Sequence, residues 1–285
     1  MKISRLFWPL WWIAPVIVLF VHFGPGQRLL RIERAAEFQR RANVLELEAQ
    51  AAQDQAYEAH LAAIEARRAS GQGLDAELVK AATAATDAEE AAYESAAVAW
   101  KAVADELSKA VDTLSPEESA ELEGVQISRA RALVRSGDVW GGISELETIV
   151  QRHATQGGED HAVARYELAT AYYYAARLLR MSGMPAQEWM IESGLARQNF
   201  RYLAEKSADA NLQGEESLTH QRNLELVLNL EQSDRSELMG KPLPRNSPRQ
   251  GQQGNRPGPG RKSKKPPEQR DGRGAGGAQD IPPGW

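Results

Sequence analysis

The chain has 285 residues, 26% charged and 7% aromatic, which is too polar for a multi-span membrane protein and too rich in Ala, Leu and Glu for complete disorder. It has no cysteine, which excludes disulfides, thiolate metal sites and a cysteine nucleophile. The net charge of −5 is uneven: Gly240–Trp285 has ten Lys and Arg against three Asp and Glu, hence +7, which leaves −12 for residues 1–239. We therefore expect an all-α body and a tail of different chemistry.

The first predicted element is an uncharged stretch, Leu6–Phe23. Its eighteen residues would form a helix of about 27 Å, close to the hydrocarbon thickness of a bilayer and longer than the apolar part of a signal peptide. The aromatic residues at its two ends suit the headgroup region, and they are Trp8, Trp11, Trp12, Phe20 and Phe23. We predict a membrane anchor within residues 1–26, in a bacterial inner membrane. A cleaved signal peptide and a buried core helix are the alternatives.

The orientation of this anchor is open, because positive residues flank both of its ends. Lys2 and Arg5 precede it, and Arg28, Arg31 and Arg34 follow it. A short basic tail before an apolar helix favours a body outside the cytoplasm, whereas the later arginines argue for the opposite side. We expect an extracytoplasmic body.

After a predicted break at Gly24-Pro25-Gly26, residues 27–114 predict an Ala-rich helical hairpin. A seven-residue repeat places small or apolar residues at all ten inward positions: Ala35, Phe38, Ala42, Leu45, Ala49, Ala52, Ala56, Ala59, Ala63 and Ala66. Ser70–Gly73 predicts a turn, and a second stripe follows: Leu74, Leu78, Ala81, Ala85, Ala88, Ala92, Ala96, Trp100, Val103, Leu107, Ala110 and Leu114. The short loop favours pairing within the chain. Self-association as a coiled coil is the alternative.

Residues 115–239 predict a stack of helix pairs. Ser115 and Pro116 are a helix-start signal, and the helix should end near Gly137. Small residues follow at Ala130 and, twelve positions on, at Gly142. This pattern resembles the tetratricopeptide repeat, in which two small residues nest where paired helices cross.

A second, longer copy of the pattern begins at "ARYELATAYYYAARLLR". Its small residues, Ala169 and Ala196, are 27 residues apart, so either a longer first helix or an inserted turn near Ser182–Pro185 is expected. A final helix, roughly Glu215–Leu238, should close the open end of the stack.

The resemblance implies a groove lined by the first helix of each pair, and the groove positions map to Arg131, Arg135, Tyr166, Thr170 and Tyr173. Such a basic and aromatic surface would suit an extended or helical acidic peptide. Of the three consecutive tyrosines at 172–174, at least one must lie in the core.

The last segment, residues 240–285, is rich in Gly, Pro, Arg, Lys and Gln and is predicted to be disordered. Its densest basic cluster could hold an anionic surface through charge alone, and it consists of Arg261, Lys262, Lys264 and Lys265. Because no aromatic residues are interleaved, we expect no specific nucleic-acid partner. A merely solvated tail is the alternative.

No pattern in the chain indicates catalysis, a cofactor or a metal. Only His153 and His161, with Glu159 and Asp160 between them, approach a ligand cluster, in a loop where polar residues are expected anyway. We expect a non-enzymatic membrane-anchored scaffold that binds other proteins. The alternative is a self-associating coiled-coil spacer whose tail adheres to a polyanion.

Overall fold

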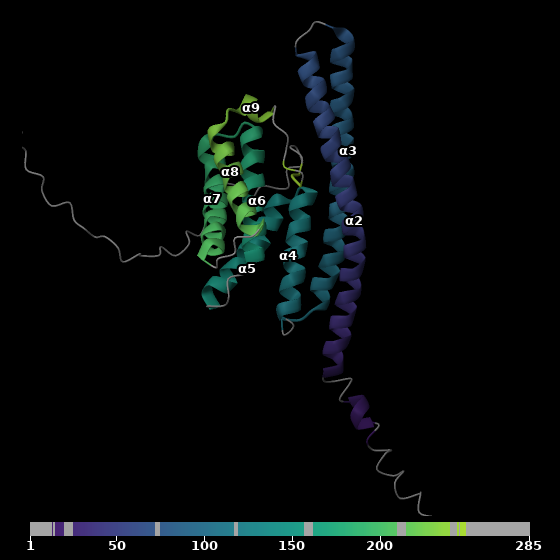
Figure 1. Cartoon of the computed structure of the whole chain (residues 1–285). Coiled ribbons are helices and arrows are strands. Elements are labelled where there is room, and N and C mark those ends of the chain that lie inside the picture. The colour runs from purple at the N-terminus through teal and green to yellow at the C-terminus, as the bar shows by residue number, and fades with distance from the viewer. Residues whose placement is uncertain are drawn as a thin grey trace, which may run out of the picture. The chain divides into compact units, whose positions relative to one another are not determined.

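The computed structural model describes residues 13, 15–19, 25–71, 75–116, 119–156, 162–209, 215–239, 244 and 246–248. All of them belong to one unit, residues 1–255, and their regular structure is entirely helical (Figure 1). From α2 to α8, helices that are consecutive in the chain pack against each other, and α9 packs against α6. The predicted all-α class is confirmed.

The predicted hairpin is formed by α2 (Pro25–Ser70) and α3 (Ala76–Thr113), which lie side by side in Figure 1. The first inward position of each seven-residue repeat in α2 is at most 2% exposed, and the second is half-buried throughout. The predicted repeat of α2 is therefore confirmed. The expected break before it is not, because α2 already begins at Pro25, and proline is well tolerated in the first turn of a helix.

The predicted stripe of α3 is correct only in its second half. From Ala96 to Leu114 the predicted residues are buried, whereas Leu78, Ala81 and Ala88 are exposed. The buried positions are shifted by one residue, to Ala82, Glu89 and Tyr93 among others. The register set by the large side chains near Trp100 continues backwards at seven-residue spacing and brings polar residues inwards. Alanine tolerates either face, so it is a poor guide to which face is buried.

The first helix pair of the predicted stack is α4 (Ser119–Ser136) and α5 (Val139–Gln156). The turn between them contains Gly137, at a φ of 101°, in the left-handed region that favours glycine. A Cβ added to Gly142 would lie 2.6 Å from the backbone oxygen of Ala130 and 2.5 Å from Cγ2 of Val134. The two small residues thus mark a close approach of the helices. The predicted helix start at Ser115 and Pro116 is followed by residues 117–118, which lie outside the described residues.

The second pair is α6 (Ala162–Met181) and α7 (Ala186–Asp209). Ala169 and Ala196 are completely buried in one core cluster, and the predicted turn at residues 182–185 is present. Gly183 in this turn follows Ala169 by 14 residues and precedes Ala196 by 13, compared with 7 and 5 residues around Gly137 in the first pair. The extra residues therefore lengthen both helices by about two turns each.

The predicted last helix is in fact two helices, α8 (Glu215–Gln232) and α9 (Arg235–Met239). The chain turns at Ser233 and Asp234, where the carbonyl oxygen of Ser233 accepts a hydrogen bond from Arg180 of α6. The bend lets Leu238 enter the core, where it is 3% exposed. We call α4–α9 the stack and α2–α3 the hairpin.

The predicted membrane anchor lies largely outside the described residues, and this includes Trp8, Trp11, Trp12, Phe20 and Phe23. Residues 13 and 15–19 are described, and they are helical. Their large apolar side chains are 50–64% exposed. Among the described residues, no helix is both long enough and apolar enough to cross a bilayer.

Candidate partner-binding surface

The two predicted groove arginines lie on α4 and are engaged by neighbouring helices. Arg131 donates from Nη2 to Oε1 of Glu46 on α2 at 3.0 Å, and its Nη1 lies 3.8 Å from Oε1 of Glu167 on α6. The guanidinium of Arg135 stacks over the ring of Trp100 on α3, 4.6 Å from the centroid. Both side chains are therefore used for internal packing between the stack and the hairpin.

Electrostatic interactions in this region follow from burial. Burial lowers the pKa of Arg135, and the neighbouring Arg131 lowers it further. Burial also raises the pKa of Glu167, and the two arginines offset this effect only in part. The carboxylates of Glu46 and Glu167 already offset the positive charge of the two arginines. The basic surface that was expected to bind an acidic peptide is therefore largely neutralised within the chain.

The three predicted groove residues of α6 have other surroundings. The ring of Tyr166 meets Phe200 of α7 edge-on at 6.1 Å, and its hydroxyl accepts a hydrogen bond from Nδ2 of Asn223 on α8 at 3.4 Å. Thr170 donates to the backbone oxygen of Tyr166 at 3.0 Å. Tyr173 is 6% exposed, and burial raises its pKa.

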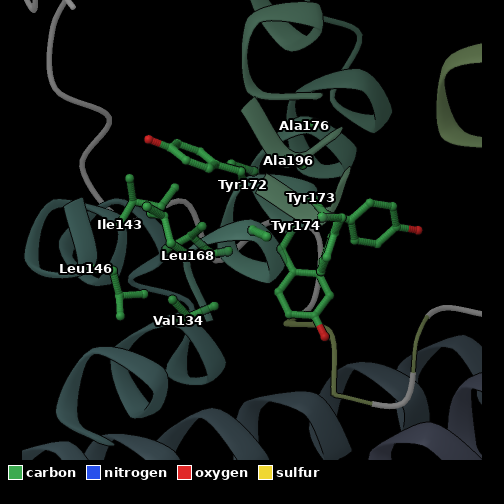
Figure 2. Packing of buried hydrophobic residues seen from close by; sticks show 14 of the residues in the cluster. Val134, Ile143, Leu146, Leu168, Tyr172, Tyr173, Tyr174, Ala176 and Ala196 are labelled. Carbon is green, nitrogen blue, oxygen red and sulfur yellow. The ribbon is translucent and has the colours of Figure 1, made fainter. Parts of the chain in front are cut away.

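The consecutive tyrosines 172–174 are all buried, and Figure 2 shows their rings pointing in three directions from α6. Tyr172 donates to Oε1 of Glu147 on α5 at 2.7 Å. Tyr174 is enclosed, and burial raises its pKa. In the same view Val134, Ile143, Leu146 and Leu168 gather on one side of the cluster. The three tyrosines thus hold α6 in the core of the stack.

The five predicted groove residues consequently do not share one open face. Arg131 and Arg135 face the hairpin, whereas Tyr166 faces α7 and α8. Their role in binding a partner stays a prediction.

A buried polar cluster in the hairpin was missed by the sequence patterns. Nδ1 of His60 lies 2.7 Å from Oε1 of Glu89, and Nη1 of Arg67 donates to Oε2 of the same carboxylate at 3.2 Å. His60 and Glu89 are 6% and 8% exposed, and Tyr93 contacts the imidazole edge-on at 6.4 Å. Continuing the seven-residue spacing backwards would have found Tyr93 from Trp100, and Glu89 from Val103 through Ala96.

The pKa of Glu89 reflects a balance within this cluster. Burial alone would raise it, but the hydrogen bonds and charges of His60 and Arg67 outweigh burial, so the pKa lies below its ordinary value. The carboxylate therefore stays ionised inside the hairpin and joins α3 to two positions of α2.

A cavity of about 160 Å³ lies between α4 and α5. Among its lining residues, Arg129 donates from Nε to Oε2 of Glu145 at 3.1 Å. Nearby, Nη1 of Arg152 lies 3.5 Å from Oε2 of Glu123, the carboxylate that also contacts His153 at 2.8 Å. The arginines here are paired by carboxylates of the same two helices.

The remaining predicted site residues lie on parts of the chain that the structure does not describe. They are His161, Glu159 and Asp160 of the loop, and Arg261, Lys262, Lys264 and Lys265 of the tail. Within the described ranges, no three His, Asp or Glu side chains are grouped in a way that could hold a metal ion.

Comparison of the chain with models of protein families, with curated proteins and with solved structures finds no match.

Proposed function

We propose that this chain is a single-anchor bacterial membrane protein whose all-α body binds other proteins and helps to assemble or hold a membrane-associated complex. The observation that carries this proposal is the exposure of the apolar, helical residues 13 and 15–19. Val16 and Val18 are 62% and 64% exposed, although the hairpin and the stack have complete cores of their own. Exposed contiguous apolar surface of this kind marks a site of membrane or protein contact, and the uncharged sequence from Leu6 to Phe23 favours the membrane.

The stack supports the protein-binding part of the proposal. Its helices pack in chain order, and the close approach at Ala130 and Gly142 is the feature that resembles the tetratricopeptide repeat. Repeats of this type present extended surfaces to partners. A membrane anchor would add effective concentration, because a partner in the same membrane is held near the body.

The hairpin argues against the alternative of a self-associating spacer. The alanines of α2 that could have formed a seam between two copies are covered by large side chains of α3. Ala35, Ala42 and Ala49, for example, share a cluster with Trp100 and Leu107. Self-association through this seam would therefore require the hairpin to open.

The tether is tested by placing charge in the apolar segment. Val16→Asp with Ile17→Asp in the full chain should move the protein from the membrane fraction to the soluble fraction, because a charge at the centre of a bilayer is costly. The matched control is Val44→Asp with Leu47→Asp, since these residues are also large, apolar and exposed, at 60% and 68%. The control should stay in the membrane, and release of both variants alike would contradict the tether.

The scaffold is tested by cross-linking and pull-down from membranes with the anchor intact, followed by sedimentation in detergent. A monomer that captures a discrete partner is expected. A long oligomer without any partner would support the spacer instead. A reporter fused after Leu238 would show on which side of the membrane the body lies.

A further inference from the structure

One polar side chain on α2 is buried against a segment that is very distant in sequence. Nε2 of Gln53 donates to the backbone oxygen of Ser247 at 3.2 Å. Both residues are 2% exposed. A buried amide contributes to stability only when its hydrogen bonds are made, so this contact is a specific part of the fold.

The segment around Ser247 is itself ordered by local bonds. The amide of Ser247 donates to the backbone oxygen of Pro244 at 2.9 Å, which closes a turn. The hydroxyl of Ser247 donates to the backbone oxygen of Pro248 at 3.2 Å, and Pro248 is buried. Because proline has a fixed φ, a segment with a proline on each side of the turn loses little conformational entropy when it docks.

The chain reaches this position from α9, which is fastened to α6. Arg235 donates to the backbone oxygen of Met181 at 2.7 Å, and the side chain of Leu238 is buried. Pro244 follows Met239 by five residues, and the hydrogen bond from Gln53 places Ser247 beside the hairpin. The segment therefore links the far end of the stack to the middle of α2.

The docking position adjoins the charged contacts between α2 and the stack. Glu46, which pairs with Arg131, precedes Gln53 by seven residues, or about 10 Å along one side of the helix. In the sequence, Ser247 is flanked by Arg245 and Arg249, whereas residues 1–239 carry a charge of −12. The segment around Ser247 and residues 1–239 thus carry net charges of opposite sign, which favours their association.

We propose that the side of α2 around Gln53 is a docking site for a proline-flanked, basic peptide segment. In the isolated chain Pro244 and residues 246–248 fill this site, and a partner protein's segment of the same chemistry displaces them. This inference rests on the proposed scaffold function and adds the class of partner to it. Gln53 recognises a backbone carbonyl, so the site selects a turn with prolines and positive charge and not one particular side chain.

The chain's own segment around Ser247 competes with any free peptide for the site at Gln53. A segment tethered to its own site has an effective concentration in the millimolar range. A free peptide of residues 241–250 should therefore bind the intact chain at least about tenfold more weakly than a chain whose own segment has been released. Release is obtained with Pro244→Gly and Pro248→Gly together, which leave Gln53 and α2 unchanged.

The contact itself can be tested by cross-linking, since the chain has no cysteine of its own. Gln50→Cys with Asn246→Cys should be joined within one molecule by a short bis-maleimide, because Gln50 lies about 60° from Gln53 around α2. Gln55→Cys with Asn246→Cys is the matched control, since Gln55 lies about 160° from Gln53. All three substituted residues are exposed. Equal yields in the two pairs would overturn the docked segment.

Peptide binding then tests the proposed competition, with a labelled peptide of residues 241–250 and the full chain in detergent. Binding should be strong in the released variant, weak in the wild type and lost when the Gln50–Asn246 cross-link is closed. In the released variant, Gln53→Leu should weaken binding at least about tenfold, whereas Gln55→Leu should not. Undiminished binding to the cross-linked chain, or no binding to the released variant, would overturn the proposal.

A measurement on the wild type guards against variants that fail to fold. The amide of Ser247 should exchange its hydrogen slowly, since it is bonded to Pro244 inside the docked turn, and rapid exchange would contradict docking. These results are separable from the scaffold function. If the segment is not docked but a discrete partner is captured from membranes, only this inference fails. If peptide and cross-link behave as expected but no partner is captured, only the scaffold fails.

Discussion

The hairpin and the stack have cores of different kinds. In the hairpin, α2 contributes mainly alanines, and the large side chains come from α3, with Trp100 the largest residue that is completely buried. In the stack, large residues from several helices meet, such as Ile143, Leu168 and Phe200. An alanine buries little apolar area, so the hairpin depends on its length and on a few large side chains, whereas the stack distributes its stability more evenly.

The buried carboxylates show the same contrast. In the hairpin, Glu89 has two cationic or hydrogen-bonding partners, and its pKa is lowered. In the stack, burial dominates at Glu145 and Glu167 and raises their pKa values. Ionisation of Glu89 therefore stabilises the folded hairpin, whereas ionisation of Glu145 or Glu167 destabilises the folded stack.

The largest effect is expected from Trp100→Ala. The side chain is 1% exposed and carries the stacked guanidinium of Arg135, so its loss should lower the free energy of unfolding by about 3–5 kcal/mol. Urea unfolding followed by circular dichroism measures this change. Val98→Ala, on the same helix but 66% exposed, should change it by less than about 0.5 kcal/mol. If Trp100→Ala is as mild as the control, the hairpin does not depend on a few large residues.

The next effect is expected from Glu89→Gln. The neutral amide loses the charge-assisted bonds to His60 and Arg67, which should cost about 1.5–3 kcal/mol at pH 7. Because the folded pKa lies below the ordinary value of 4.5, this stabilisation is complete above pH 4.5 and is lost as the pH falls through the folded pKa. The difference between wild type and variant should therefore shrink in acid.

The control for this measurement is Glu94→Gln, an exposed glutamate on the same helix. It should leave the unfolding free energy nearly unchanged at either pH. A constant difference between wild type and Glu89→Gln from pH 7 to pH 3 would contradict the lowered pKa.

The third effect concerns the helix crossing in the stack. Gly142→Ala would place a methyl group 2.6 Å from the backbone oxygen of Ala130, and backbone cannot rotate away, so the variant should lose about 1–3 kcal/mol. Gly124→Ala on α4 meets no atom within 4 Å and should instead gain up to about 1 kcal/mol from helix propensity. Thermal unfolding compares the two, and a harmless Gly142→Ala would refute the close approach.

Much of this fold could be predicted where a residue has one physical role. Gly137 was predicted as the end of a helix, and the structure shows why glycine suits it, at a φ of 101°. Ala130 and Gly142 were predicted as a pair because small residues allow helices to cross closely. The register of α3 before Ala96 was wrong, since alanine is compatible with both faces. The bend at Ser233 was missed because it depends on Arg180, which is distant in sequence.

The candidate site was harder to predict than the fold. A pattern identifies Arg131 as a position on a helix face, but not that Glu46, 85 residues away, pairs with it. The docked turn at Ser247 lies in a stretch whose composition indicates disorder, and only its contact with Gln53 places it. The sequence did offer one signal of buried polar contacts, namely polar residues at inward positions of an apolar repeat. These residues are Gln53, His60 and Glu89.

The smallest effect, and the sharpest comparison, is expected from Glu167→Gln in the stack. The pKa of Glu167 is raised because burial outweighs the attraction of Arg131, whose Nη1 lies 3.8 Å from the carboxylate, and of Arg135. The ionised form of Glu167 therefore costs stability at neutral pH. Its folded pKa lies above the ordinary value of 4.5. The favourable, protonated state is thus complete below pH 4.5 and is lost as the pH rises through the folded pKa.

Glu167→Gln should therefore raise the free energy of unfolding at pH 7, because the variant has no carboxylate to ionise in this buried position. This gain should disappear near pH 4, where the wild-type carboxyl is also neutral. Glu225→Gln on α8, which is exposed, should have no effect at either pH. Replacing glutamate by glutamine would then destabilise the hairpin at position 89 and stabilise the stack at position 167. A loss at pH 7 comparable to that of Glu89→Gln would mean that Glu167 is held as a counter-ion of Arg131, and the contrast between the two cores would not extend to their charges.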